Sequence, residues 1–303
     1  MTDDTESELH FGEWAAVTSS HGASLRGLTW RGQPVVTGYR GAAAKQGGQG
    51  DVLLPFPGRV KAGRYAWDGV EHQLPLTDKE GPNAIHGFVR GVAWQTESQA
   101  ADAVTYRLDF AGAEGYPFPL GIRLEYRLAE DGLVVTCEIS NAGATDAPVG
   151  VGFHPYFTVG SPVVDGDVLE LPFGEVLEFE QLVPTGEVTW VSETELDFRV
   201  ARPIADTRFN HCFAAPARDA TGRAIVTLRG GDRTVRVWMD DAFGHVVVYS
   251  GDALPAGVAR TSIAIEPMTC ATDALNHPNW GLIRLSPGET RVARWGVGVT
   301  STP

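Results

Sequence analysis

Apolar and polar residues alternate along much of this chain, and a period of two restricts it to β-strands. The alternation runs through Val104–Phe110 and again through Ile122–Leu128 and Leu133–Ile139. Because successive side chains of a strand point to opposite faces of the sheet, each segment predicts a strand with one apolar face. The Asp131-Gly132 pair between the last two segments predicts the turn of a hairpin.

Other segments extend this pattern, whereas helical spacing is scarce. Ala224–Leu228 and Thr234–Met239 flank a glycine-rich turn, and His245–Tyr249 is a short β-branched run suited to a buried strand. The 36 glycines and 19 prolines interrupt the chain every few residues, as many short turns require. We therefore predict an all-β fold built from stacked antiparallel sheets.

Three segments are predicted to be loops or turn-rich connections, namely Gly41–Gly50, Gly112–Pro119 and Pro184–Glu195. Strand patterns continue on both sides of each, so none of them is typical of a linker between domains. A length of 303 residues is compatible with two domains, but all-β folds often reach this length as one. We predict a single domain over residues 1–303.

Composition narrows the function classes. The net charge of −14 repels phosphate backbones, so we expect no nucleic-acid partner. The acidic, polar N-terminus does not resemble a secretory signal, and no apolar run approaches the ~18 residues of a membrane span. Three widely separated cysteines form no zinc-site or disulfide pattern, which favours a reducing cytoplasm. They are Cys137, Cys212 and Cys270.

Two side chains are candidates for moving protons. His154 stands in Gly152-Phe153-His154-Pro155-Tyr156-Phe157, and Glu266 ends an alternating run just before a proline. Histidine titrates near neutrality, and burial at a strand end would raise the pKa of a carboxylate towards that range. The alternatives are a hydrogen-bonded structural histidine and a surface glutamate.

Two further side chains are candidates for binding. His86 lies in Asn83-Ala84-Ile85-His86-Gly87, and Arg59 in Pro55-Phe56-Pro57-Gly58-Arg59. An arginine in such apolar surroundings pairs with a carboxylate or reaches a ligand oxygen, and the histidine alone is compatible with an ordinary turn. The chain contains no Gly-x-Ser-x-Gly, no His-Glu-x-x-His and no phosphate loop, so neither a metal nor a dinucleotide cofactor is predicted.

Taken in order, these motifs resemble those of the aldose 1-epimerase (galactose mutarotase-like) family, particularly its bacterial members. The resemblance runs from about Leu53 to the C-terminus and includes the segment Glu266–Asn276, with the sequence Glu-Pro-Met-Thr-Cys-Ala-Thr-Asp-Ala-Leu-Asn. It implies a large antiparallel β-sandwich, the galactose mutarotase-like supersandwich, which binds a free sugar in an open cleft. It also implies an isomerase that acts as a monomer or homodimer and interconverts the α and β anomers of an aldohexose such as galactose or glucose.

The same resemblance implies roles for individual residues. His154 would be the general acid and Glu266 the general base, while Arg59 and His86 would hold the sugar and its ring oxygen. The family commonly has an aspartate where this chain has Asn210, and often an asparagine where it has Gly58. Asn210 can still donate and accept hydrogen bonds to sugar hydroxyls, but it carries no charge.

Three other functions remain open at this stage. A sulfonated or phosphorylated hexose would need additional cations in the cleft, for which Arg59, Arg90 and Lys61 are candidates. A sugar-binding or sensor protein on the same fold would need neither an acid nor a base. A glycoside hydrolase would need a second carboxylate beside Glu266, and Asp273 in the same motif is more simply a residue that caps a turn.

Overall fold

The alternating segments form strands in the computed structural model, which describes residues 4–301. The three segments of the first predicted hairpin and its neighbour are β11 (Ala103–Phe110), β12 (Leu120–Ala129) and β13 (Gly132–Asn141). Their register pairs Tyr106 with Leu124 and Leu124 with Cys137, so the apolar side chains of all three strands lie on the same face of the sheet. The pattern of the sequence therefore decides which face of this sheet is buried.

Most strands belong to two large sheets. One has 12 strands, ten of them in the order β1-β2-β3-β4-β16-β25-β24-β21-β18-β19, with β15 and β5 joined beside β25. Their bounds are β1 (Glu6–Phe11), β2 (Trp14–Ser19), β3 (Leu25–Trp30), β4 (Gln33–Val36), β5 (Val52–Leu53), β15 (Gly152–Phe153), β16 (Tyr156–Phe157), β18 (Phe173–Glu180), β19 (Val183–Trp190), β21 (Asn210–Pro216), β24 (His245–Tyr249) and β25 (Ile263–Met268).

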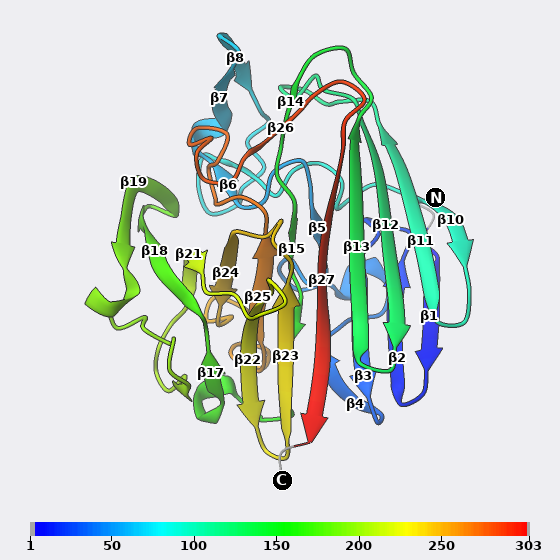
Figure 1. Cartoon of the computed structure of the whole chain (residues 1–303), viewed down its shortest axis with the longest axis vertical. Helices are drawn as coiled ribbons and strands as arrows, with labels where there is room; N and C mark the ends of the chain where they lie inside the picture. The colour runs from blue at the N-terminus through cyan, green and yellow to red at the C-terminus, as the bar shows by residue number, and fades with distance from the viewer. Residues whose placement is uncertain (1–3, 302–303) are drawn as a thin grey trace.

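The other large sheet has nine strands in the order β10-β11-β12-β13-β27-β23-β22-β17-β20. In Figure 1 this sheet faces the viewer, with β27 between β13 and β23 and strands of the 12-stranded sheet behind it. Its remaining bounds are β10 (Gln95–Gln99), β17 (Val168–Glu170), β20 (Arg202–Pro203), β22 (Ala224–Gly230), β23 (Arg233–Met239) and β27 (Thr290–Ser301).

The remaining regular elements among the described residues are three short pairs of strands and four single turns of 3₁₀ helix. The pairs are β6 (Arg59–Val60) with β9 (Ala84–Ile85), β7 (Arg64–Trp67) with β8 (Val70–Gln73), and β14 (Ala147–Val149) with β26 (Ile283–Leu285). Residues 4–301 contain no α-helix, and no helical segment among them is long and apolar enough to cross a membrane. Four 3₁₀ turns are present: η1 (Ala42–Ala44), η2 (Lys61–Gly63), η3 (Val164–Gly166) and η4 (Val191–Glu193).

The predicted all-β fold of stacked antiparallel sheets is confirmed, but one predicted loop is wrong. Residues 184–190 of the Pro184–Glu195 segment lie in β19, which pairs with β18 along the edge of the larger sheet. The segment looked like a loop because Pro184, Gly186 and exposed polar residues hide the alternation. An edge strand tolerates such residues, since one side of its backbone has no partner strand.

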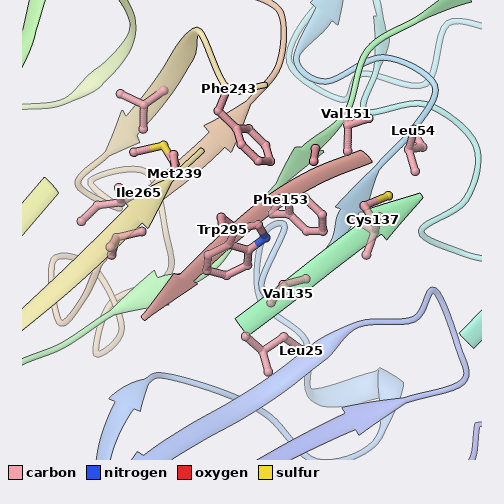
Figure 2. Close-up of a cluster of buried hydrophobic side chains, with 14 of the residues drawn as sticks. Leu25, Leu54, Val135, Cys137, Val151, Phe153, Met239, Phe243, Ile265 and Trp295 are labelled. Atoms are coloured by element: carbon pink, nitrogen blue, oxygen red, sulfur yellow. The ribbon is translucent and has the colours of Figure 1, made fainter. Parts of the chain in front are cut away.

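The main core lies between the two large sheets. Figure 2 shows Trp295 of β27 beside Phe153 of β15, with Ile265 of β25 nearby. The Phe153 ring centroid lies 5.4 Å from that of Trp295 and 6.3 Å from that of Phe243. This contact joins the sheets at the point where the chain is about to reach His154.

Replacing Trp295 with alanine tests the importance of this contact. The side chain is 1% exposed, so its loss leaves a large cavity, and we expect the free energy of unfolding to fall by about 3–5 kcal/mol. Urea denaturation followed by circular dichroism measures the change. Trp190→Ala is the matched control, because Trp190 is 57% exposed at the sheet edge and its removal should change stability by less than about 1 kcal/mol. Equal losses in both variants would contradict this account of the core.

Candidate functional site

His154 and Glu266 meet on the face of the 12-stranded sheet that points away from the second sheet. Phe153 and Ile265 belong to the main core, so strand alternation directs the next residue in each segment to the opposite face. There the Nε2 atom of His154 lies 3.4 Å from the Oε1 atom of Glu266. Both side chains are almost inaccessible, with relative exposures of 7% and 2%. The two predicted proton-transfer groups therefore form one buried pair.

The backbone and a neighbouring ring fix the position of His154. Its N–H donates to the carbonyl of Asp51 at 3.0 Å, and its carbonyl accepts the N–H of Gly50 at 2.9 Å. Pro155 follows and favours extended backbone before it. The imidazole stacks on Tyr156, with ring centroids 5.2 Å apart and planes 15° from parallel. The ring therefore has little freedom to turn.

His86 lies edge-on to the same imidazole. Its ring centroid is 5.6 Å from that of His154, at an angle of 79°. The Nδ1 atom of His86 accepts the N–H of Gly58 at 3.2 Å, and the His86 N–H donates to the Gly58 carbonyl at 2.9 Å. A neutral His86 ring must therefore carry its proton on Nε2, where it can donate to a ligand. Gly58 has a φ of +68°, and a Cβ there would lie 2.4 Å from Oγ1 of Thr272, so no asparagine fits at this position.

Arg59 follows Gly58 and is held by two carboxylates. Its Nε donates to Oδ2 of Asp78 at 2.7 Å, and its Nη2 donates to Oε2 of Glu80 at 2.5 Å. Burial works against ionisation of Asp78, but the hydrogen bond from Arg59 keeps the pKa of that carboxyl below its usual value. The positive charge of Arg59 in turn acts on Glu266, where it lowers the pKa in opposition to burial. Arg59 thus belongs to the electrostatic surroundings of the His154–Glu266 pair.

Asn210 shares the sheet face of Glu266 but stands at its exposed margin. Asn210 pairs with Tyr249, and Tyr249 pairs with Ala264, which lies two residues before Glu266 on the same face of β25. Two strand spacings of about 4.8 Å each separate β21 from β25. The four other predicted residues are therefore clustered, whereas Asn210 borders the region over Tyr249.

Several residues of the site were not identified from the sequence. Tyr249 is the clearest, because it ends a predicted strand and alternates with the buried Val248. Burial raises the pKa of Tyr249, and the negative charges of Glu80, Asp252 and Glu266 act in the same direction. No sequence pattern marks Asp78 or Glu80, because both are distant from Arg59 along the chain and meet it only through the pairing of β6 with β9.

Asp273 has a structural environment. Its Oδ1 accepts the backbone N–H of Lys61 at 3.0 Å and the side-chain amide of Asn276 at 2.8 Å. The carboxylate thus ties the end of the Glu266–Asn276 motif to the segment after Arg59. This role matches the turn-capping interpretation of Asp273 and leaves Glu266 without a comparable carboxylate partner there.

Burial makes the uncharged forms of both central groups favourable. It lowers the pKa of His154 to about 3, with smaller contributions from the positive charges of Lys45 and Arg90. It also raises the pKa of Glu266 well above its usual value. The resting pair is therefore a neutral imidazole beside a protonated carboxyl, and the two groups share one proton.

This protonation state is one transfer away from a charged pair. Movement of the shared proton from Glu266 to His154 produces a carboxylate base and an imidazolium acid without any change in the total number of bound protons. The 3.4 Å separation of Oε1 and Nε2 suits exchange of that proton through a small adjustment of either side chain or through a bound hydroxyl. The site can therefore remove one proton from a ligand and deliver another nearby.

Comparisons with known proteins bear on the family and the fold of the chain. The aldose 1-epimerase family model matches residues 8–296. The uncharacterized protein YihR of Escherichia coli K12 is 32% identical over 269 residues, which cover 88% of this chain and 85% of the relative. Galactose mutarotase of Bos taurus is 28% identical, over 86% of this chain and 82% of the relative. A solved aldose epimerase homologue from C. elegans has a TM-score of 0.88 at 18% identity, over 99% of this chain and 100% of its own, and thereby confirms the predicted fold.

The pH dependence of stability tests the buried state of Glu266. Because its folded pKa is raised above 4.5, the unfolded chain gains stability from ionisation as the pH rises beyond that value, until the folded pKa is reached. We expect the stability of Glu266→Gln relative to that of the wild type to increase across this window, by up to about 1.4 kcal/mol for each pH unit. Urea denaturation at intervals between pH 5 and 8 measures the difference.

The exposed Glu187→Gln exchange is the control for this experiment, and its effect on stability should not change over the same range. If the difference between Glu266→Gln and the wild type is equally constant, the carboxyl of Glu266 ionises in the folded protein as it does in the unfolded chain.

Proposed function

Because the chain belongs to the aldose 1-epimerase family and is an isomerase of that type, we propose that it interconverts the α and β anomers of a free aldohexose such as galactose or glucose. The observation that carries this proposal is the buried contact of His154 with Glu266, with His86 edge-on to the same imidazole. Anomer exchange requires one base and one acid acting on neighbouring oxygens of a sugar, and this pair supplies both.

The proposed reaction begins with the pair in its charged form. Glu266 takes the proton of the C1 hydroxyl while His154 delivers a proton to the ring oxygen, and the bond between C1 and the ring oxygen breaks. The resulting open chain has an aldehyde at C1. Rotation about the C1–C2 bond presents the other face of the aldehyde, and the two proton transfers then run in reverse to close the ring. Each group ends in its starting protonation state.

Two neighbouring residues are proposed to bind and orient the sugar. The Nε2–H of His86 donates to a sugar oxygen, since Gly58 occupies its other ring nitrogen. Arg59 stabilises negative charge that develops on oxygen during ring opening, and its two carboxylate partners hold the guanidinium in place. Asn210 contributes neutral hydrogen bonds at the exposed margin of the site.

The charges around the pair favour a neutral sugar over a sulfonated or phosphorylated one. The guanidinium of Arg59 already faces Asp78 and Glu80. Arg90 lies 3.9 Å from the buried carboxylate of Asp51. Each of these cations is therefore accompanied by negative charge, which weakens its attraction for an anionic ligand group.

Polarimetry on freshly dissolved α-D-glucose and α-D-galactose tests the proposal, with spontaneous mutarotation subtracted. We expect the wild type to accelerate the change in rotation, and His154→Ala and Glu266→Gln each to lower kcat by about 10²–10⁴-fold, because each removes one proton transfer. Calorimetric sugar binding should persist in Glu266→Gln.

A wild type that binds sugar without accelerating mutarotation would instead be a sugar-binding or sensor protein. A wild type that acts only on a 6-phosphorylated or 6-sulfonated hexose would show that the substrate is charged. Full activity in both variants would place the reaction elsewhere on the chain.

The dependence of kcat/KM on pH should be bell-shaped. At low pH a second proton joins the pair and removes the base, and burial moves this limb well below the ordinary histidine value of 6.5. At high pH the last proton leaves and removes the acid, and burial moves this limb well above 4.5. Both limbs belong to the coupled pair. Initial rates measured from pH 4 to 10 give the profile, and an acid limb near pH 4.5 together with an alkaline limb near pH 6.5 would indicate two solvated groups instead.

A further inference from the structure

The segment Gly41–Gly50 covers the imidazole of His154, and one buried ion pair ties it down. We propose that Lys45 and Asp51 form a latch that holds Gly47 and Gly48 against His154 and Tyr156, which makes both charged residues positioning residues for the reaction. The inference rests on the proposed function for its kinetic consequences, whereas the contacts themselves are independent of it.

Asp51 is the fixed part of the latch. Its side chain is 1% exposed, and Lys45 forms an ion pair with its Oδ1. Burial raises the pKa of this carboxyl despite the opposing positive charges of Lys45 and Arg90. A carboxylate that is removed from water in this way depends on its partner cation for stabilisation. The ion pair therefore holds the Lys45 ammonium group beside Asp51.

The backbone connects this ion pair to His154. The carbonyl of Asp51 accepts the N–H of His154, and the Asp51 N–H donates to the carbonyl of Gly48 at 3.0 Å. Asp51 thus contacts the loop and the catalytic candidate at the same time. The backbone hydrogen bond to His154 comes from Gly50, at the end of the loop. The Lys45 side chain secures the earlier part of the loop, before Gly47.

Gly48 lies so close to His154 that no side chain fits there. A Cβ at this position would stand 2.5 Å from Cδ2 and 2.9 Å from Nε2 of the imidazole. At Gly47 a Cβ would stand 3.1 Å from the Tyr156 hydroxyl. The loop backbone therefore packs against the Cδ2 side of the imidazole, beside the Nε2 atom that contacts Glu266.

Loosening the loop should change both the orientation and the protonation of the imidazole. Six charged or titratable groups surround His154. They are Glu266 from β25, His86 after β9, Lys45 from the loop, Arg90, Asp51, and Tyr156, which stacks on the imidazole. Burial, and to a lesser extent Lys45 and Arg90, depresses the pKa of His154. Removing the Lys45 charge and admitting water would both raise that pKa from about 3 towards 6.5.

The kinetic test uses Lys45→Met, Asp51→Asn and the double variant. We expect each single variant to lower kcat by about 10- to 100-fold with little change in KM, because a displaced imidazole transfers protons poorly. The double variant should be no worse than the more damaging single variant, since the two residues act as one unit. Lys45→Arg should restore most of the activity. The control is Arg40→Met, which removes an exposed pair with Glu6 and Glu8 beside the same loop.

A second variant alters the loop without touching the ion pair. Gly48→Ala adds one methyl group that must displace the imidazole, and its backbone does not require a positive φ, so the same loss of kcat is expected. Gly91→Ala is the matched control, because a Cβ there meets nothing within 4 Å.

The test has a readout besides activity. The His154 ring signals in ¹H–¹⁵N NMR spectra, assigned with His154→Gln, should shift in Lys45→Met, Asp51→Asn and Gly48→Ala, while those of His72 on the β7–β8 hairpin stay unchanged. In Lys45→Met the His154 signals should also titrate at a higher pH. This result would support the latch even if the wild type accelerates no mutarotation. Unchanged His154 signals would overturn the proposal. A raised KM with unchanged kcat, together with additive effects in the double variant, would also overturn it, because that result indicates direct sugar binding by Lys45.

Discussion

The close contact between His154 and Glu266 in a space almost without water is the interaction on which the site depends. In water the two groups would titrate separately, so that the carboxyl would be ionised at neutrality and the imidazole would titrate close to it. Burial removes the stabilisation of those charges, so the pKa of the carboxyl rises and that of the imidazole falls until the pair keeps a single proton. A pair of this kind can move that proton between its two members, which produces the base and the acid that the proposed ring opening requires.

The sandwich provides this contact through strand alternation. Phe153 and Ile265 belong to the core between the sheets. Packing of Phe153 against Trp295 fixes the position of β15 relative to the second sheet. The next residue on each segment is consequently forced to the opposite face, where His154 and Glu266 meet. The second sheet contributes no residue to the pair, but without its apolar face neither residue would be directed correctly.

Opposite charges surround the pair in two separate groups. Arg59 is held by Asp78 and Glu80 on one side, and Asp51 holds Lys45 on the other. In each group a carboxylate fixes a cation whose charge acts on the central pair, so the cation is oriented before any sugar arrives. Preorganisation of this type avoids rearrangement during the reaction.

The sequence by itself determined most of the strands, their apolar faces and the candidate residues for the chemistry. Alternation is local, and motifs such as Gly-Phe-His-Pro-Tyr-Phe place His154 beside residues that restrict its backbone, so both are legible without coordinates. The sequence does not reveal contacts between residues that are distant along the chain. Pro184–Glu195 contains an edge strand whose exposed residues conceal its period, and nothing local shows that Asp78 pairs with Arg59 or that Gly48 lies against His154. Only the tertiary structure decided these contacts, because they depend on which loops the two packed sheets bring over one face, and that depends on the packing of the whole core.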